Sequence, residues 1–429
     1  MSVDAEVRAL EERLRCPEPD ENGYASGSVT YSRLDALRRL AVLAAAGSVP
    51  PAERRGGVNT HIHTAKSFSF FASPTDAAWK AFRAGVDVFG INDHYTLCGH
   101  DEFREACVIL GIQPMFSMEA VATWEEALAA SAAVNDPVNP GRTYLTAKGV
   151  TRALAERSSG ARDLRRMKDA LAQRNQEITR RVAMVATERL GVESSIDWAA
   201  VLGLTPHGEP TERHVCEATA LFLAQTYPEG EERRVAASKL LADEVPAVWL
   251  DDAAKFQNAI RARLIKVGRP AYVVENSDAF LPLDRMVALG LELGAVPTYP
   301  VLGNPVTPWE EDLDRLLDCL AIYRIHALEV IPDRNTPERL AEIVDCAAAR
   351  GLPIVNGTEH NTKEPAPLVD RFFFEPRFRP HFELGARVIL GHQALRARGE
   401  EGYVRDDGSL PPGDRQAHLE RVASAAPTW

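Results

Sequence analysis

Short apolar segments alternate with amphipathic segments in two separate parts of this chain. The apolar segments cover residues 58–63, 86–91, 112–117, 293–301, 325–331, 351–355 and 386–390. Each has the length of a buried strand, and many of the segments between them carry apolar residues at helical spacing. Such an alternation of strands and helices predicts a parallel α/β sheet with helices packed on it.

The alternation stops between residues 121 and 270. There the sequence predicts helices at residues 151–156, 161–190, 211–227 and 229–242. This segment is interpreted as a helical insertion between two strands of the sheet. Because it follows the C-terminal end of a strand, we expect it to form a lid over that edge of the sheet. Helices are also predicted at residues 3–14 and 32–46, ahead of the first strand.

The predicted strands end in residues that bind metal ions. In chain order, the strand ends carry His61 and His63, then Asp93 and His94, then Glu119. Residues i and i+2 of a strand point to the same face, about 6–7 Å apart at their bases, so His61 and His63 can chelate one divalent ion. Catalytic residues collect at the C-terminal strand ends of parallel α/β folds. The pattern therefore predicts a metal site.

Composition narrows the class of protein. The chain has 49 basic and 61 acidic residues, a net charge of −12, which argues against a large nucleic-acid-binding surface. Its six cysteines show no paired spacing, as expected of reduced thiols. No signal peptide or membrane-spanning run is evident. We therefore expect a cytoplasmic protein without a nucleic-acid or membrane partner. The apolar stripe of the helix at residues 32–46 is expected either to dock on the sheet or to form a homo-oligomer interface.

These motifs, in this order, resemble those of the PHP (polymerase and histidinol phosphatase) family. The shared features are His-x-His after the first strand, Asp-His after the second, a lone Glu after the third and a late Gly-Thr-Glu-His segment at residues 357–360. The resemblance covers roughly residues 56–120 and 285–395. It implies a distorted seven-stranded (β/α) barrel, TIM-like in form, with two or three metal ions at the strand ends. Most members of the family are phosphoesterases.

The resemblance also gives a division of the chain. The expected parts are a helical N-terminal extension at 1–55, the first part of the barrel at 56–120, the helical insertion at 121–270, the second part of the barrel at 271–395 and a C-terminal tail at 396–429.

The early motifs match the family residue by residue. His61 and His63 match its first two ligands, and Glu119 matches the carboxylate that usually bridges two metal ions. His94 matches the histidine of the family's Asp-His motif. Asp93 is then expected to orient an imidazole rather than to bind metal.

The late motifs depart from the family pattern. The family's Gly-Ser-Asp-x-His reads Gly-Thr-Glu-His-Asn at residues 357–361, so Glu359 replaces an aspartate ligand. Asn361 stands where the last histidine is expected, unless the neighbouring His360 takes its place. A His-Pro motif appears as Tyr299 followed by proline. One site keeps a full set of ligands, and we expect one to three ions of zinc, manganese or iron.

The implied chemistry is hydrolysis. A bound divalent ion lowers the pKa of water to about 7 and stabilises a developing oxyanion. His94 and His360 are candidates to protonate the leaving group, with Asp93 in support. The candidate contacts to a small anionic substrate are Lys66, Tyr299, Arg334 and Asn361.

The sequence therefore predicts a metal-dependent hydrolase, most specifically a phosphoesterase that acts on a small phosphorylated metabolite. A metal-dependent amide or lactone hydrolase, or a sugar isomerase, stays open because the late metal motifs are altered. A non-catalytic, metal-binding regulatory protein is the third alternative. The retained set of His61, His63, Glu119 and Glu359 argues against it.

Overall fold

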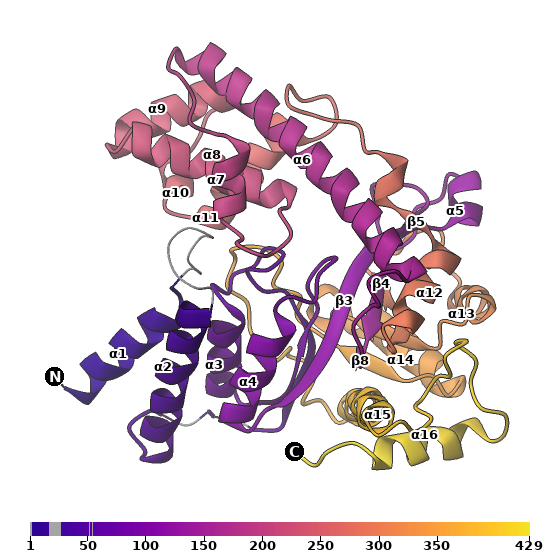
Figure 1. Cartoon of the computed structure of the whole chain (residues 1–429). Helices are drawn as coiled ribbons and strands as arrows, with labels where there is room; N and C mark the ends of the chain where they lie inside the picture. The colour runs from indigo at the N-terminus through magenta and orange to yellow at the C-terminus, as the bar shows by residue number, and fades with distance from the viewer. Residues whose placement is uncertain (1, 17–26, 51, 54) are drawn as a thin grey trace.

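The computed structural model describes residues 2–16, 27–50, 52–53 and 55–429. Its centre is a mixed sheet that curls into a nearly closed barrel (Figure 1). In the described residues the strands follow one another around the barrel in the order β1 (Gly57–Ile62), β2 (Val86–Ile91), β3 (Gln113–Thr123), β4 (Arg142–Lys148), β6 (Val296–Val301), β7 (Ala327–Val330) and β8 (Ile354–Asn356). A short strand, β5 (Leu281–Pro282), pairs with β3 beside this path. The prediction of a seven-stranded α/β barrel is confirmed.

The first and last strands close the barrel through hydrogen bonds. The side-chain amide of Asn356 donates to the carbonyl of Val58 at 2.9 Å, and the Thr60 hydroxyl donates to the Asn356 carbonyl at 2.9 Å. Just beyond β8, the amide of Glu359 donates to the carbonyl of His61 at 2.8 Å. This closure brings the late sequence motif directly against the first one.

The strand β4 was not predicted, and it lies inside the segment interpreted as a helical insertion. It runs antiparallel to both of its neighbours, β3 and β6. Its sequence, Arg-Thr-Tyr-Leu-Thr-Ala-Lys, is rich in residues typical of strands and lies between Gly141 and Gly149, both with positive φ. The prediction of a helix at residues 151–156 is wrong, because these residues form turns and extended chain. The predicted domain boundary at residue 120 also falls inside β3, so it leaves out residues 121–123 of that strand and all of β4.

The remaining insertion forms a helical layer of its own. Its elements are α6 (Ser159–Leu190), α7 (Trp198–Gly203), α8 (Glu212–Thr226), α9 (Gly230–Leu241), α10 (Ala247–Leu250), α11 (Ala253–Ile260) and a π-helical turn (Arg261–Ile265). The helices predicted at residues 161–190, 211–227 and 229–242 agree with α6, α8 and α9. The second half of α6 and the other helices enclose a separate hydrophobic core, whereas the first half of α6 packs against α12 at the barrel (Figure 1).

The N-terminal helices dock on the barrel. The elements involved are α1 (Val3–Leu14), α2 (Gly27–Ala45), α3 (Pro74–Ala84) and α4 (His100–Leu110). Leu34, Leu37 and Leu40 of α2 are buried against these neighbours. Arg33 makes a buried, bidentate ion pair with Glu102 of α4, at 2.9 and 2.7 Å. Of the two expected roles for the apolar stripe, the structure therefore shows docking on the barrel.

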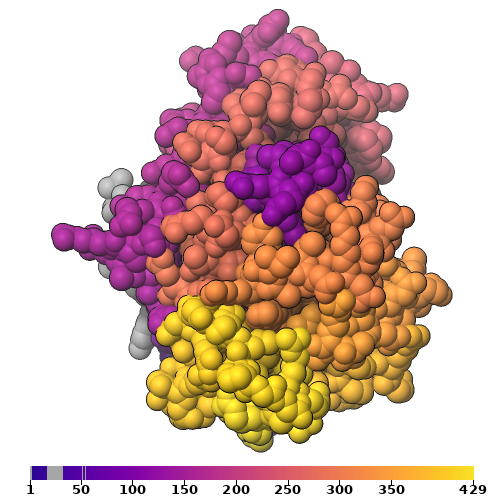
Figure 2. Space-filling model, turned by 90° about the vertical axis from the view of Figure 1, so that its right-hand side faces the viewer, coloured from indigo at the N-terminus to yellow at the C-terminus, as the bar shows by residue number. Residues whose placement is uncertain are grey.

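The other outer helices follow β3 and the later strands. They are α5 (Glu125–Ala129), α12 (Leu283–Glu292), α13 (Leu313–Ile322), α14 (Pro337–Ala349), α15 (Arg379–Ala397) and α16 (Arg415–Ser424), with 3-10 turns at Ser277–Ala279 and Pro332–Arg334. Figure 2 shows the C-terminal segment, in yellow, covering the lower part of one face. It is packed rather than loose, because Tyr403, Leu419 and Val422 are buried. In the part of the chain that the structure describes, no helix is both long and apolar enough to cross a membrane.

The strand predicted at residues 386–390 is wrong. These residues lie in the middle of α15, where Phe382, Ala386 and Ile389 are buried at helical spacing. His392, which follows them, does not face the barrel mouth. Its Nε2–H donates to the Gly294 carbonyl at 2.9 Å. A run of apolar, β-branched residues is compatible with a strand or a buried helix, and packing decides between them.

Candidate metal centre

Three side chains converge at one end of the barrel. His61 and His63 lie at the end of β1 and Glu119 lies in β3, and all three are buried. Their ligand atoms lie within 4.8 Å of one another. The Nε2 atoms of the two histidines are 3.2 Å apart, and the Glu119 carboxylate lies 3.9 Å from His61 Nε2 and 3.6 Å from His63 Nε2. Two imidazoles and a carboxylate facing one point form a suitable donor set for a divalent metal ion.

His63 is oriented by a short chain of hydrogen bonds. The Asp93 carboxylate accepts from the Ser67 hydroxyl at 2.6 Å and from the backbone amide of Thr64 at 2.7 Å. Because the Ser67 hydrogen points to Asp93, the Ser67 oxygen is free to accept from His63 Nδ1–H, 3.3 Å away. Nε2 of His63 then carries the lone pair that faces the cluster. Burial and the nearby His94 and His61 hold the pKa of His63 well below its usual value, so the ring is neutral.

Substitution of Asp93 should weaken metal binding without touching a ligand. Asp93→Ala removes both carboxylate oxygens, so Ser67 loses the partner that fixes its hydroxyl and the tautomer of His63. We expect metal affinity to fall by roughly 10- to 100-fold, as measured by competition with a coloured chelator. The control is Asp101→Ala, since Asp101 is an exposed residue of α4. Unchanged affinity in the Asp93 variant would contradict this role.

His61 is oriented by a residue that the sequence analysis did not assign to the site. Glu329, in β7, lies with one carboxylate oxygen 3.0 Å from His61 Nδ1. Burial opposes protonation of His61, but Glu329 and Glu119 outweigh it and raise its pKa. A hydrogen on Nδ1 directed at Glu329 leaves Nε2 available for a metal ion. A lone glutamate within a short, buried strand is the sequence signal that could have identified this residue.

Lys148 neutralises Glu329 inside the barrel. This fully buried lysine of β4 has its ammonium 2.5 Å from Glu329 and 2.7 Å from the carbonyl of Thr60. Thr146, two residues earlier on the same face of β4, donates its hydroxyl to Glu329 at 3.2 Å. Although burial disfavours its charge, His61 and Lys148 lower the pKa of Glu329 to about 2. Lys148 was not among the predicted site residues because β4, which carries it, was not predicted.

His94 lies on the other side of Glu119. Its Nδ1 atom is 3.2 Å from the Glu119 carboxylate, and it has no hydrogen-bond partner in the described part of the chain. Burial, with the nearby charges of His61 and Arg213, lowers the pKa of His94 to about 3, so this ring is also neutral. Burial and the carboxylates of Glu359 and Glu329, against the opposing effect of His61, raise the pKa of Glu119 to about 8. A buried imidazole nitrogen without a partner beside such a carboxylate fits a cation-binding site.

The late motif contributes to the same region but not to the three-residue cluster. Glu359 has a φ of 68° and is bridged to Ile62 at the end of β1. It does not belong to the group of ligand atoms within 4.8 Å. Its carboxylate instead forms an ion pair with Arg334 and accepts a hydrogen bond from the Asn361 amide. These three predicted site residues are therefore brought together beside the cluster.

Three other predicted site residues lie elsewhere. His360 has both ring nitrogens engaged, Nδ1 by Thr358 at 2.9 Å and Nε2 by the Ala366 carbonyl at 3.0 Å, so it offers no ligand atom to the cluster. Tyr299 is buried outside the barrel interior, where its hydroxyl donates to Glu310 at 2.9 Å. Its position follows from the alternation of side chains along β6, which puts it on the opposite face from Pro300. The ammonium of Lys66 lies 3.3 Å from the Pro206 carbonyl, at the contact with the insertion.

A cavity of about 380 Å³ opens above the cluster. Its wall combines metal-ligand candidates, polar side chains and an apolar side. The lining residues include His61, Glu119, Tyr144, Arg213, Pro300, Val301, Ile331, Arg334, Glu359 and Asn361. Arg213 comes from α8, so the insertion forms part of this wall. The volume lies at the small end of the range for small-molecule sites.

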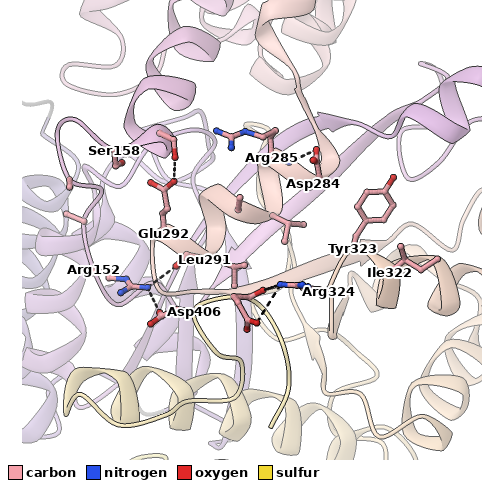
Figure 3. Close-up of a pocket in the computed structure, with 16 residues that line it drawn as sticks. Arg152, Ser158, Asp284, Arg285, Leu291, Glu292, Ile322, Tyr323, Arg324 and Asp406 are labelled. Carbon is pink, nitrogen blue, oxygen red and sulfur yellow. Dashed lines mark hydrogen bonds and ion pairs between the residues drawn. The ribbon is translucent and has the colours of Figure 1, made fainter. Parts of the chain in front are cut away.

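A second cavity, of about 970 Å³, lies outside the barrel among α6, α12, α13 and the C-terminal segment (Figure 3). Its charged groups neutralise one another. Arg152 pairs with Asp406 at 2.7 Å, and Glu292 accepts hydrogen bonds from the first residues of α6. Its lining contains no histidine and shares no residue with the first cavity. Of these two cavities, only the first is lined by residues of the cluster, His61 and Glu119.

Two solved structures resemble this chain. A proposed metal-dependent phosphoesterase from Bifidobacterium adolescentis has 19% sequence identity and a TM-score of 0.50, and the match covers 77% of this chain and 96% of that one. An amidohydrolase from Chromobacterium violaceum, solved with sulfate and without metal, has 14% identity and a TM-score of 0.48 over 75% of this chain and 95% of that one. No family model and no curated protein matches the chain. The first likeness shows that the chain shares the fold of the Bifidobacterium protein.

Proposed function

We propose that this protein is a metal-dependent hydrolase, and specifically a PHP-type phosphoesterase that acts on a small phosphorylated molecule. The observation that carries the proposal is the convergence of His61, His63 and Glu119 at the floor of a cavity. The cluster lies at the C-terminal end of β1, in a barrel whose fold is shared with a proposed metal-dependent phosphoesterase. Arg334 at the cavity wall supports an anionic substrate.

The chain's own residues have distinct roles in this proposal. His61, His63 and Glu119 would hold one divalent ion, which supplies activation of water and neutralisation of an oxyanion when bound. Asp93, through Ser67, and Glu329 keep the two histidines in the tautomers that face this ion. A second ion would draw on His94 and Glu119, whose facing atoms are 3.2 Å apart.

Neither His94 nor His360 protonates the leaving group in this proposal. His94 is neutral, so it serves as a ligand rather than as an acid. His360 is occupied by its two hydrogen bonds. Arg334 and Asn361 lie on the cavity wall and both bind the Glu359 carboxylate. In this proposal they release Glu359 and bind the anionic group of the substrate in its place.

The proposal is tested by turnover. The purified protein is stripped with a chelator, reloaded separately with zinc, manganese or iron, and assayed for release of inorganic phosphate from a panel of phosphomonoesters and phosphodiesters. We expect phosphate release that depends on the added metal. A parallel panel of amides and lactones distinguishes the alternative. Turnover of that panel alone, or metal binding without any turnover, would refute the phosphoesterase assignment.

A further inference from the structure

Arg213 is a partly buried cation that faces the cavity above the cluster. It lies in the first turn of α8, and its side chain lines the cavity together with His61 and Glu119. Its guanidinium donates to the side-chain oxygen of Asn258 at 3.2 Å and lies 5.9 Å from the ring centre of Phe68. Among the described residues, no carboxylate lies within ion-pairing distance of it. Burial and the neighbouring Arg261 lower the pKa of Arg213, as expected of a charge without a counter-ion.

Other arginines of the insertion are paired. The carboxylate next to Arg213 in the sequence, Glu212, faces the other way and binds Arg174 at 3.1 Å and also Arg261. Arg180, on the exposed side of α6, pairs with Glu177 at 2.7 Å. Because even a partly buried charge loses hydration and gains nothing in return when it has no partner, the isolation of Arg213 inside the cavity wall points to an anion that is supplied from outside the chain.

The insertion is fixed on the barrel close to this arginine. The Thr205 hydroxyl donates to the carbonyl of Ala65 at 2.9 Å, and the amide of Glu209 donates to the carbonyl of Lys66 at 2.7 Å. These barrel residues directly follow the His61–His63 motif. The start of α8 is therefore held against the loop that carries Ser67, and Arg213 is positioned over the same cavity as the cluster.

We propose that Arg213 binds an oxyanion of the substrate, a phosphate or a carboxylate, and that the insertion thereby selects the substrate. The other cation in the cavity wall, Arg334, is already paired with Glu359, which leaves Arg213 as the group with an unmatched charge. A guanidinium binds such an oxyanion through two parallel hydrogen bonds. The proposal deepens the proposed function and rests on it for the reaction, whereas anion binding by Arg213 does not itself require a metal ion.

The test is anion binding by Arg213→Gln. Dissociation constants for inorganic phosphate and for malonate are measured by calorimetry at fixed ionic strength, with both the metal-free and the metal-loaded protein. We expect Arg213→Gln to weaken binding of at least one anion by about tenfold or more, because a charge-assisted hydrogen bond is lost. Arg180→Gln, in the same insertion, should bind both anions like the wild type. Loss for one anion alone supports the proposal and identifies the group.

A conservative variant guards against misfolding. Arg213→Lys keeps the charge without the planar fork, so it should fall between the wild type and Arg213→Gln. Equal binding by the wild type and Arg213→Gln, or binding of neither anion by the wild type, would overturn the proposal. Binding that depends on Arg213 in a protein that takes up no metal would instead uphold it and refute the proposed function.

Discussion

The His61→Ala/His63→Ala double variant is expected to retain no tightly bound metal and to lose metal-dependent hydrolysis. The two imidazoles supply two of the three donors within 4.8 Å, so Glu119 keeps only His94 beside it, and two donors do not hold an ion tightly. Charge stabilisation by a bound ion contributes several kcal/mol to a transition state, and we expect activity to fall by roughly 1,000-fold or more. Elemental analysis and the phosphate-release assay measure the two effects separately.

The matched control for this variant is His381→Ala. His381 lies on α15, outside the cavity, and its removal should leave the metal content and the rate unchanged. Two or more ions in the wild type, all lost in the double variant, would support a site that includes His94. Full metal content in the double variant would place the ion elsewhere and would refute the assignment of these ligands.

Lys148→Met is expected to destabilise the protein more than an ordinary surface substitution does. It leaves the Glu329 carboxylate fully buried without the ammonium that lies 2.5 Å away. Removal of one partner of a buried ion pair typically costs about 3–5 kcal/mol, because the other charge stays uncompensated. The free energy of unfolding of the chelator-treated protein, measured in urea, tests this value. Metal-free protein is required, since a bound ion would also compensate Glu329.

A double-variant cycle separates the charge from the loss of packing. Lys148→Met/Glu329→Gln removes both charges, so it should recover part of the stability lost in the single variant. The same double variant keeps the test valid if the single variant does not fold. Lys255→Met, at an exposed lysine of α11, is the control and should change stability by less than about 0.5 kcal/mol. If Lys148→Met also lowered the free energy of unfolding by less than about 0.5 kcal/mol, the ion pair with Lys148 would not be what stabilises the buried charge of Glu329.

The sequence alone indicated most of the early part of the candidate site. A period of two along β1 puts His61 and His63 on one face, and the alternation of strands and helices puts the end of each parallel strand at the same edge. Asp93, His94 and Glu119 follow for the same reason. These relations are local, because each depends on a strand and the few residues after it. The positions of these residues can therefore be predicted from the sequence without knowing how distant strands pair.

The residues that only the tertiary structure identified depend on long-range pairing. Glu329 and Lys148 come from β7 and β4, and they meet His61 only because the barrel closes between β1 and β8. The sequence did not indicate that β4 runs antiparallel to β3 and β6. The strands on either side of it belong to parallel parts of the sheet, and the sequence around it is dominated by helices.

Side-chain direction was the second property that the sequence left undetermined. Tyr299 and His360 each stand beside a predicted motif, yet one faces the outer helices and the other is turned into hydrogen bonds with Thr358 and Ala366. A shift of one residue in register moves a side chain to the other face of a strand. The sequence determined the segments that form the barrel except β4, and it placed the candidate metal ligands of the early motifs at strand ends. Strand register, closure and the docking of the insertion decided which side chains face the cavity, because these depend on contacts between residues far apart in the chain.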